Sequence, residues 1–326
     1  MTIANMQVYD EQIRLRTIEL LGQDLQKFNA ASGGTIVLDM GRWMGNYTRE
    51  SFYNSLASAQ RRTDRFAANN AQAATALSES EVGGVKVAGG FGPVLFEPSQ
   101  LTWLSSSPEE AINVISQGFS DALLADQLNT VVGCAIAAIE NIPALVNDVS
   151  ALTAGAGALT QSVLNGSHAK FGDRSGMLRA DIMTGAAYHK LIEKGLANGE
   201  RLFDSTSVTV QSILGKLFVV SDIPALTVAG TPNKTKVLSL VAGAAICDNA
   251  SDIITNLQTN NGKERIETTW QADYSFGVKL KGFKWDETNG GASPEDAELF
   301  TGSNWDNAMA DVKHTAGTLA IADIDQ

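Results

Sequence analysis

The amino-acid sequence predicts an α+β fold, because strand-like and helix-like segments occur in one chain of 326 residues without dividing it into two tidy halves. Residues 35–40 and 178–183 alternate between apolar and polar side chains, which is typical of strands. Residues 83–104 read as a longer strand. Apolar side chains between residues 108 and 141 instead recur every three or four positions, which indicates a helix.

The N-terminal part of the chain predicts an amphipathic helix from Tyr9 to about Ala31, ended by the sequence SGG. Its apolar face consists of Ile13, Leu20, Leu21, Leu25 and Phe28. The first strand follows at Thr35–Met40. We expect it to pair with the twisted strand at Gly83–Leu104, which glycines and prolines interrupt.

The segment between these two strands, Asn46–Glu81, is rich in alanine and asparagine, and we interpret it as mostly helical. Thr48 would cap its helix, and Phe52 and Leu56 would form the apolar stripe. The segment has too little apolar surface to bury itself, which is unusual for an insertion in an enzyme core.

The clearest element is a single long helix that begins after Ser107. Ser107 at the N-cap, Pro108 at the first helical position and Glu110 at the third are the parts of a capping box. The apolar residues behind it are Ile112, Ile115, Phe119, Leu123, Leu128, Val131, Ala135 and Ile139. A helix of this length spans on the order of 50 Å, whereas three or four turns are typical of compact enzymes.

The stretch from Lys170 to Gly195 predicts a turn, a strand and a helix. After the strand at Leu178–Met183, Thr184 caps a helix that Gly195 ends. The buried face of this helix consists of Tyr188, Leu191 and Ile192. His189 has no acid at a spacing that would orient it, so we interpret it as a surface or interface residue and not as a base.

Composition excludes several classes of function. The 36 acidic and 24 basic residues give a formal charge of −12, which repels polyphosphate and argues against sequence-specific nucleic-acid binding. Cys134 and Cys247 lie among small apolar residues without a CxxC spacing, so we interpret them as core residues. The longest apolar runs are shorter than the roughly 20 residues that cross a bilayer. The chain starts without a secretion signal, so we expect it in a reducing cytosol and not in a membrane.

No motif points to catalysis. The glycines of TAGAGALT are followed by Thr160 where a dinucleotide fingerprint has Gly or Ala, and neither a phosphate loop nor a G-x-S-x-G elbow occurs. Three histidines are present, at His168, His189 and His314, and no two of them form a sequence-local zinc motif. Asp296 and Glu298 lie near the start of a short predicted helix. A favourable contact with the helix dipole explains these two carboxylates better than catalysis does. We therefore expect no enzyme, metal or cofactor.

Several motifs, in a fixed order over about Asn29 to Ala316, resemble the major capsid proteins of tailed bacteriophages with the Hong Kong 97-type fold. They are the long capped helix and the segments GGVKVAGGFGPVLFEPSQLTWL, AKFGDRSGMLRADIMTGAAYHKLIEKGL, SILGKLFVVSDIPAL and GFKWDETNGGASPEDAELFTGSNWDNAM. The resemblance implies four parts of the chain. These are an N-terminal arm at 1–33, an extended E-loop region at 34–104, a peripheral domain with a spine helix at 105–144 and 256–326, and an axial domain at 145–255.

The resemblance implies that the chain self-assembles into the hexamers and pentamers of an icosahedral head that encloses double-stranded DNA. A net negative shell would repel DNA and let the genome slide during packaging. The virion would be its final location, after synthesis in the cytoplasm of the bacterial host. Implied partners are copies of the chain, a portal and a separate scaffolding protein. Whether a decoration protein is also a partner stays open.

Candidate contacts between subunits lie in the E-loop region, because aromatic side chains contribute much of the energy of such interfaces. They are Trp43, Phe52, Tyr53, Phe91 and Phe96. The alternative is that about half of them pack only the local hairpin. Some family members crosslink subunits through a lysine and an asparagine, and Lys86 lies where such a lysine occurs. No acid and asparagine pattern accompanies it.

Two other classes stay open at this point. An encapsulin-like nanocompartment shell has a related fold but holds cargo enzymes instead of DNA. The long excursion at 46–81 argues against it, and neighbouring genes would separate the two. A soluble α+β enzyme would be a monomer or a small oligomer with a polar pocket, and no motif favours it.

Overall fold

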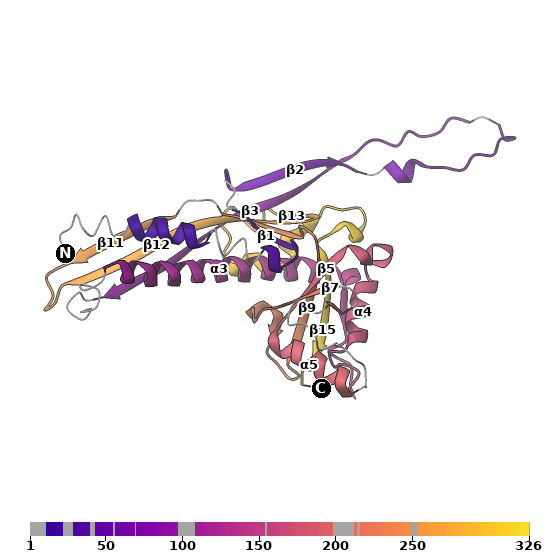
Figure 1. Cartoon of the computed structure of the whole chain (residues 1–326). Coiled ribbons are helices and arrows are strands. Elements are labelled where there is room, and N and C mark those ends of the chain that lie inside the picture. The colour runs from indigo at the N-terminus through magenta and orange to yellow at the C-terminus, as the bar shows by residue number, and fades with distance from the viewer. Residues whose placement is uncertain are drawn as a thin grey trace.

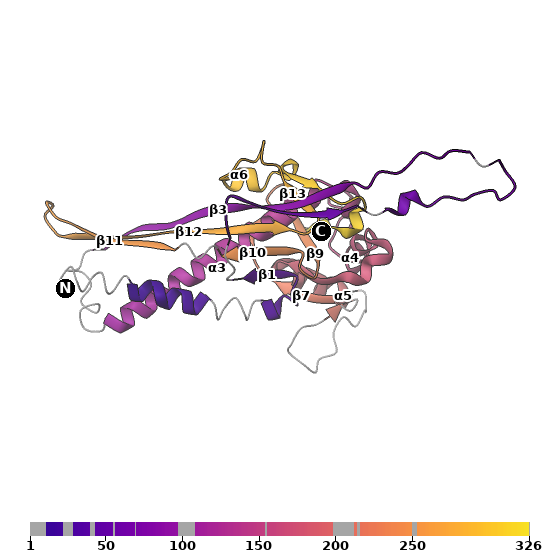
Figure 2. The same cartoon turned by 90° about the horizontal axis from the view of Figure 1, so that it is seen from above.

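The computed structural model describes residues 11–21, 29–39, 43–54, 56–68, 70–96, 108–153, 155–197, 212–213, 216–249 and 253–325. It has two β-sheets that a long helix connects, and a thin hairpin projects far beyond both sheets (Figure 1). The view from above shows the hairpin leaving at one end and a second pair of strands reaching out at the other end (Figure 2).

The larger sheet has eight strands in the order β1-β10-β12-β3-β13-β14, with β11 on β12 and β2 on β3. Their bounds are β1 Ile36–Asp39, β2 Tyr47–Tyr53, β3 Glu79–Phe96, β10 Ala245–Asn249, β11 Ile254–Asn260, β12 Glu267–Leu280, β13 Phe283–Trp285 and β14 Trp305–Asn307. Strands β3 and β12 pair antiparallel over most of their length. A short helix, α6 (Asp296–Leu299), lies between β13 and β14 in the chain.

The smaller sheet has seven strands in the order β4-β15-β9-β5-β7-β6, with β8 on β9. Their bounds are β4 Val146–Asp148, β5 Leu178–Met183, β6 Ser212–Ile213, β7 Lys216–Val220, β8 Thr227–Val228, β9 Lys234–Val241 and β15 Gly317–Asp323. Helix α4 (Gln161–Ala169) contacts β4, β9 and β15. Helix α5 (Gly185–Ala197) adds Ala187 and Leu191 to the apolar cluster that α4 shares with this sheet.

The described residues also form six short 3-10 helices. They are η1 Leu56–Ala59, η2 Pro143–Leu145, η3 Gly172–Met177, η4 Pro224–Leu226, η5 Gly302–Asn304 and η6 Val312–His314.

Helix α3 runs from Pro108 to Glu140, which confirms the predicted long helix. Residues 131–139 are buried on all sides, because this part of α3 contacts β10 and β12 of one sheet and β15 of the other. Val114–Glu140 is long and apolar enough to cross a membrane by composition alone, but 67% of the apolar window is buried inside the molecule. It is therefore the core helix that joins the two sheets.

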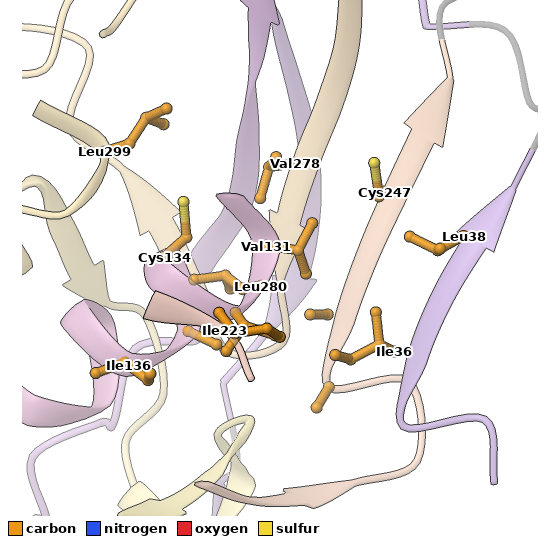
Figure 3. Packing of buried hydrophobic residues seen from close by; sticks show 14 of the residues in the cluster. Ile36, Leu38, Val131, Cys134, Ile136, Ile223, Cys247, Val278, Leu280 and Leu299 are labelled. Atoms are coloured by element: carbon orange, nitrogen blue, oxygen red, sulfur yellow. The ribbon is translucent and has the colours of Figure 1, made fainter. Parts of the chain in front are cut away.

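The core around α3 contains both cysteines (Figure 3). Cys134 on α3 and Cys247 on β10 are free, and both are buried. Burial raises the pKa of each thiol well above its ordinary value, so neither is a thiolate. This confirms that they are core residues.

The N-terminal helix was predicted in part. Residues 11–21 and 29–31 are helical, and Ile13 and Leu21 are buried as expected. The hydroxyl of Ser116 on α3 donates to the carbonyl of Ile13 at 3.2 Å, which fixes the helix on α3. The predicted apolar residues Leu25 and Phe28 lie outside the described residues.

Two predictions for the first hundred residues are wrong. Tyr47–Tyr53 is strand β2 and not a helix capped by Thr48, because β3 begins at Glu79 and offers it a partner strand. Among the described residues of the segment that follows, up to β3, only η1 is helical. Strand β1 pairs parallel with β10, and not with β3, because β12 occupies the edge of β3 that faces it.

The strands of the two sheets do not follow the predicted domain boundaries along the chain. Strand β10 lies within residues 145–255, the predicted axial domain, and pairs with β1 and β12 in the first sheet. Strand β15 lies within residues 256–326, part of the predicted peripheral domain, and pairs with β4 and β9 in the second sheet. All seven residues of β15 are buried, which explains why an apolar C-terminal strand enters the middle of a sheet.

Candidate assembly surfaces

The projecting hairpin is the most exposed part of the described chain. Strands β2 and β3 pair from Tyr47 opposite Val85 to Tyr53 opposite Glu79. Beyond them the loop extends away from both sheets in both views (Figures 1 and 2). Phe66 at its far part is 93% exposed, and Leu56 and Leu77 are more than half exposed. Since the loop buries none of these side chains, they are available to another molecule.

The loop also carries a basic cluster, Arg61, Arg62 and Arg65. All three arginines are exposed, and none forms an ion pair with another residue in the described part of the chain. The carboxylate of Asp64 between them accepts from the backbone N–H of Phe66 at 2.9 Å. Sequence reasoning missed this cluster, although three arginines within five residues of an acidic chain were a visible signal.

Two of the six predicted contact residues pack inside their own chain. Trp43 is 5% exposed, and its ring covers Gly277 so closely that a Cβ there would overlap it. The ring of Phe91 lies 5.4 Å from that of Phe119 and 5.8 Å from that of Trp270, measured between centroids. Trp43 packs on Gly277 of β12, which lies opposite Lys86, and Phe91 packs against α3 and β12 farther from the hairpin.

Three of the other candidates lie on or near the hairpin. Tyr53 is 70% exposed at the end of β2, and Phe52 beside it is half-buried. Lys86 is half-buried on β3, opposite Gly277 of β12. The side chain of Phe96 lies outside the described part. Phe52 and Tyr53 therefore continue the exposed surface of the loop toward the body.

The described residues contain no cluster of three or more acidic, histidine or cysteine side chains that could hold a metal ion. One buried pair was missed by sequence reasoning. His168 Nε2 on α4 lies 2.9 Å from Asp181 Oδ1 on β5, and both side chains are buried. The pair lies 13 residues apart, on a helix and the strand beneath it, so no spacing in the sequence revealed it. Its burial makes it a structural contact between α4 and the sheet.

A long helix between two sheets, with an extended hairpin beyond them, defines the Hong Kong 97-type capsid fold. The family and the fold together make the protein a capsid shell protein, which is structural and not an enzyme. The chain belongs to the major capsid protein 13-like family, whose model matches residues 5–319.

One solved structure supports this fold, and two others are similar to the chain. The chain is similar to the cyanophage Pam1 capsid asymmetric unit, with a TM-score of 0.55 and 11% identity over 89% of this chain and 88% of that one. A Microbacterium phage Oxtober96 structure has a TM-score of 0.48 and 12% identity over 90% of each chain. The holo-SrpI encapsulin complex from Synechococcus elongatus PCC 7942 has a TM-score of 0.49 and 10% identity over 89% and 86%. No curated protein matches the chain.

Proposed function

We propose that copies of this chain form hexamers and pentamers that close into the icosahedral head of a tailed bacteriophage around its double-stranded DNA. The observation that carries the proposal is the projecting loop, which leaves apolar side chains and three exposed arginines in solvent. A surface of this kind becomes buried only against another molecule, and aromatic and arginine side chains are enriched where interfaces form.

We propose that the loop of one copy lies on the body of the next, with Phe52 and Tyr53 continuing the contact. The whole chain carries a formal charge of −12, so the basic loop of one copy meets a neighbour of opposite net charge. A contact between two different patches repeats around a ring, and such a ring closes when the rotation fits.

We propose the same four parts of the chain that the resemblance implies, with one change in the strands assigned to the axial domain. Residues 1–33 are the arm, and 34–104 contain the E-loop. The spine helix α3 and the eight-stranded sheet form the peripheral domain, and the seven-stranded sheet forms the axial domain. The axial domain then includes β15 and excludes β10, because strand pairing sets its limits.

Further partners follow from the same proposal. A head shell needs a portal and, for this chain, a separate scaffolding protein, while a decoration protein would bind the outer surface. The protein would be made in the host cytoplasm and end in the virion. The acidic chain would enclose DNA without reading its sequence.

The test is electron microscopy and size-exclusion chromatography of the chain expressed alone and with its gene neighbours. We expect closed shells, tubes or ring-shaped capsomers, and portal, terminase and tail genes nearby. A small monomer at high concentration, with its neighbours present, would refute assembly. Shells beside a cargo-enzyme gene, without phage genes, would refute the phage head and indicate a nanocompartment.

A further inference from the structure

The root of the hairpin, which we call the joint, is the part of β3 where pairing with β12 ends and pairing with β2 begins. Residues 79–85 of β3 pair with β2, whereas residues 85–96 pair with β12. At Gly83 the strand also pairs with Lys284 of β13. A Cβ on Gly84 would overlap the carbonyl oxygen of Val278, so only glycine lets these strands meet so closely.

One face of this joint is held by two ion pairs. The guanidinium of Arg49 on β2 donates to Glu287 twice, from Nε to Oε1 at 2.8 Å and from Nη2 to Oε2 at 2.6 Å. The ammonium of Lys284 on β13 donates to Glu81 Oε2 on β3 at 3.0 Å. The hydrogen bond from Lys284 lowers the pKa of Glu81, and the charge of Arg49 acts in the same direction. Both strands of the hairpin are thus tied to β13 and the residues after it.

The opposite face is held by a third ion pair. Glu50 follows Arg49 in β2, so its side chain points to the other side of the hairpin. Its carboxylate accepts from Lys279 Nζ on β12 at 2.9 Å. Lys279 also lies 5.6 Å from the ring centroid of Trp43. Ion pairs therefore connect both faces of the hairpin to the body.

Packing alone does not hold this joint. A cavity of about 390 Å³ lies beside it. Its lining includes Thr48, Glu50, Val82, Lys279, Leu280 and Met309. The space behind the hairpin is therefore not filled, and Glu50 and Lys279, which form an ion pair, both line it.

We propose that these three ion pairs position the hairpin, setting the direction in which it leaves the body and hence how one copy reaches the next. The pairs are Glu50–Lys279, Arg49–Glu287 and Glu81–Lys284. This role rests on the proposed assembly. Thirteen residues separate Tyr53 from Phe66, which is about 40 Å of extended chain. A rotation of about 10° at the joint then moves the loop by about 7 Å, which is enough to break every contact at its far part.

Charge reversal at the joint tests the proposal. Spin labels on Ala76→Cys in the loop and Ser303→Cys in the body report the angle, because both native cysteines are buried and escape labelling. Labelled chain is diluted with unlabelled chain, so that only distances within one molecule are measured. We expect Glu50→Lys to shift the mean distance by about 4 Å or to broaden its distribution by as much. The double variant Glu50→Lys, Lys279→Glu should restore the parent distribution.

The matched control is Asp173→Lys. The Asp173–Lys313 pair has the same 2.9 Å separation and a similar exposure, but it lies away from the hairpin. This variant should keep the parent distances.

Electron microscopy of the same proteins should show fewer closed particles for Glu50→Lys and recovery in the double variant. Unchanged distances, or normal particles in spite of changed distances, would overturn the positioning role. If the parent itself formed no particles, the assembly proposal would fail, while the distances would still decide the role of the pairs at the joint.

Discussion

At the scale of single residues, the buried His168–Asp181 pair has the largest predicted effect. Asp181, Ser239 and Thr318 lie opposite one another on β5, β9 and β15, and therefore share one face of the sheet. The hydroxyl of Ser167 on α4 donates to Thr318 Oγ1 at 3.1 Å, beside His168. Polar contacts between α4 and the sheet have few alternative partners in this interior, so they fix the position of the helix.

Replacing His168 by alanine should destabilise the chain strongly. The buried Asp181 carboxyl would lose its hydrogen-bond partner, and leaving a buried polar group without its partner costs about 1–3 kcal/mol. The free energy of unfolding, from urea denaturation followed by circular dichroism, measures this. His189→Ala is the control, because His189 is exposed on α5 and its loss should change stability by at most about 0.5 kcal/mol. A loss below about 1 kcal/mol for His168→Ala would show that the pair is not important for stability.

At the scale of elements, α3 and β12 are joined by a hydrogen bond between two titratable groups. The hydroxyl of Tyr274 donates to Asp126 Oδ2 at 2.7 Å. Burial raises the pKa of the Asp126 carboxyl above its ordinary 3.8, although the bond from Tyr274 acts the other way. Burial and the neighbouring Asp126 also raise the pKa of Tyr274. The packing of the spine helix on the large sheet therefore depends on pH.

The sign of this dependence follows from the raised pKa. The folded chain binds the Asp126 proton more tightly than the unfolded chain, so this group stabilises the fold below pH 3.8, and the contribution is lost as pH rises through the folded pKa. Asp126→Asn carries no charge and should gain stability relative to the wild type as pH rises from about 3.5 to 6. Urea denaturation across that range measures the difference. Asp121→Asn, an exposed change of the same kind on the same helix, is the control variant. A difference for Asp126→Asn that is independent of pH would contradict the assignment.

Elements whose signals are local were predicted from the sequence, and elements that depend on distant partners were not. Thr184 caps α5 as expected, because its hydroxyl accepts from the N–H of Ala187 three residues later, at 3.2 Å. In contrast, β2 is a strand because β3 pairs with it, and its alanine-rich surroundings hid this. The Glu50–Lys279 pair joins residues 229 positions apart, so no sequence window contains it. The candidate contacts between subunits stay a prediction, and two of them, Trp43 and Phe91, turn inward.

At the scale of the whole molecule, the two sheets share one core while the hairpin stays outside it. Strands β10 and β15 cross between the sheets along the chain, and α3 contacts both sheets. One hydrophobic cluster includes residues of α3, β10, β12 and β15. We therefore expect the body to unfold as one unit. The exposed loop contributes little to that transition, because its described residues 56–79 are exposed throughout wherever their burial is defined.

Removing the loop should separate folding from assembly. Residues 55–77 can be replaced by Asn-Gly, a turn that suits two antiparallel strands, since the N–H of Asn54 already donates to the carbonyl of Ser78 at 2.9 Å. The shortened chain should melt within about 3 °C of the parent, because no core contact is lost. It should form no closed particles in the electron microscope.

A second variant with a Gly/Ser linker of the original length distinguishes chain length from chemistry. It should also fail, because the exposed aromatic and arginine side chains are absent from it. Closed particles from the linker variant would mean that the loop acts only as a spacer. Closed particles from the shortened chain would mean that the shell is held by the body alone, and the arginine cluster would then need another role.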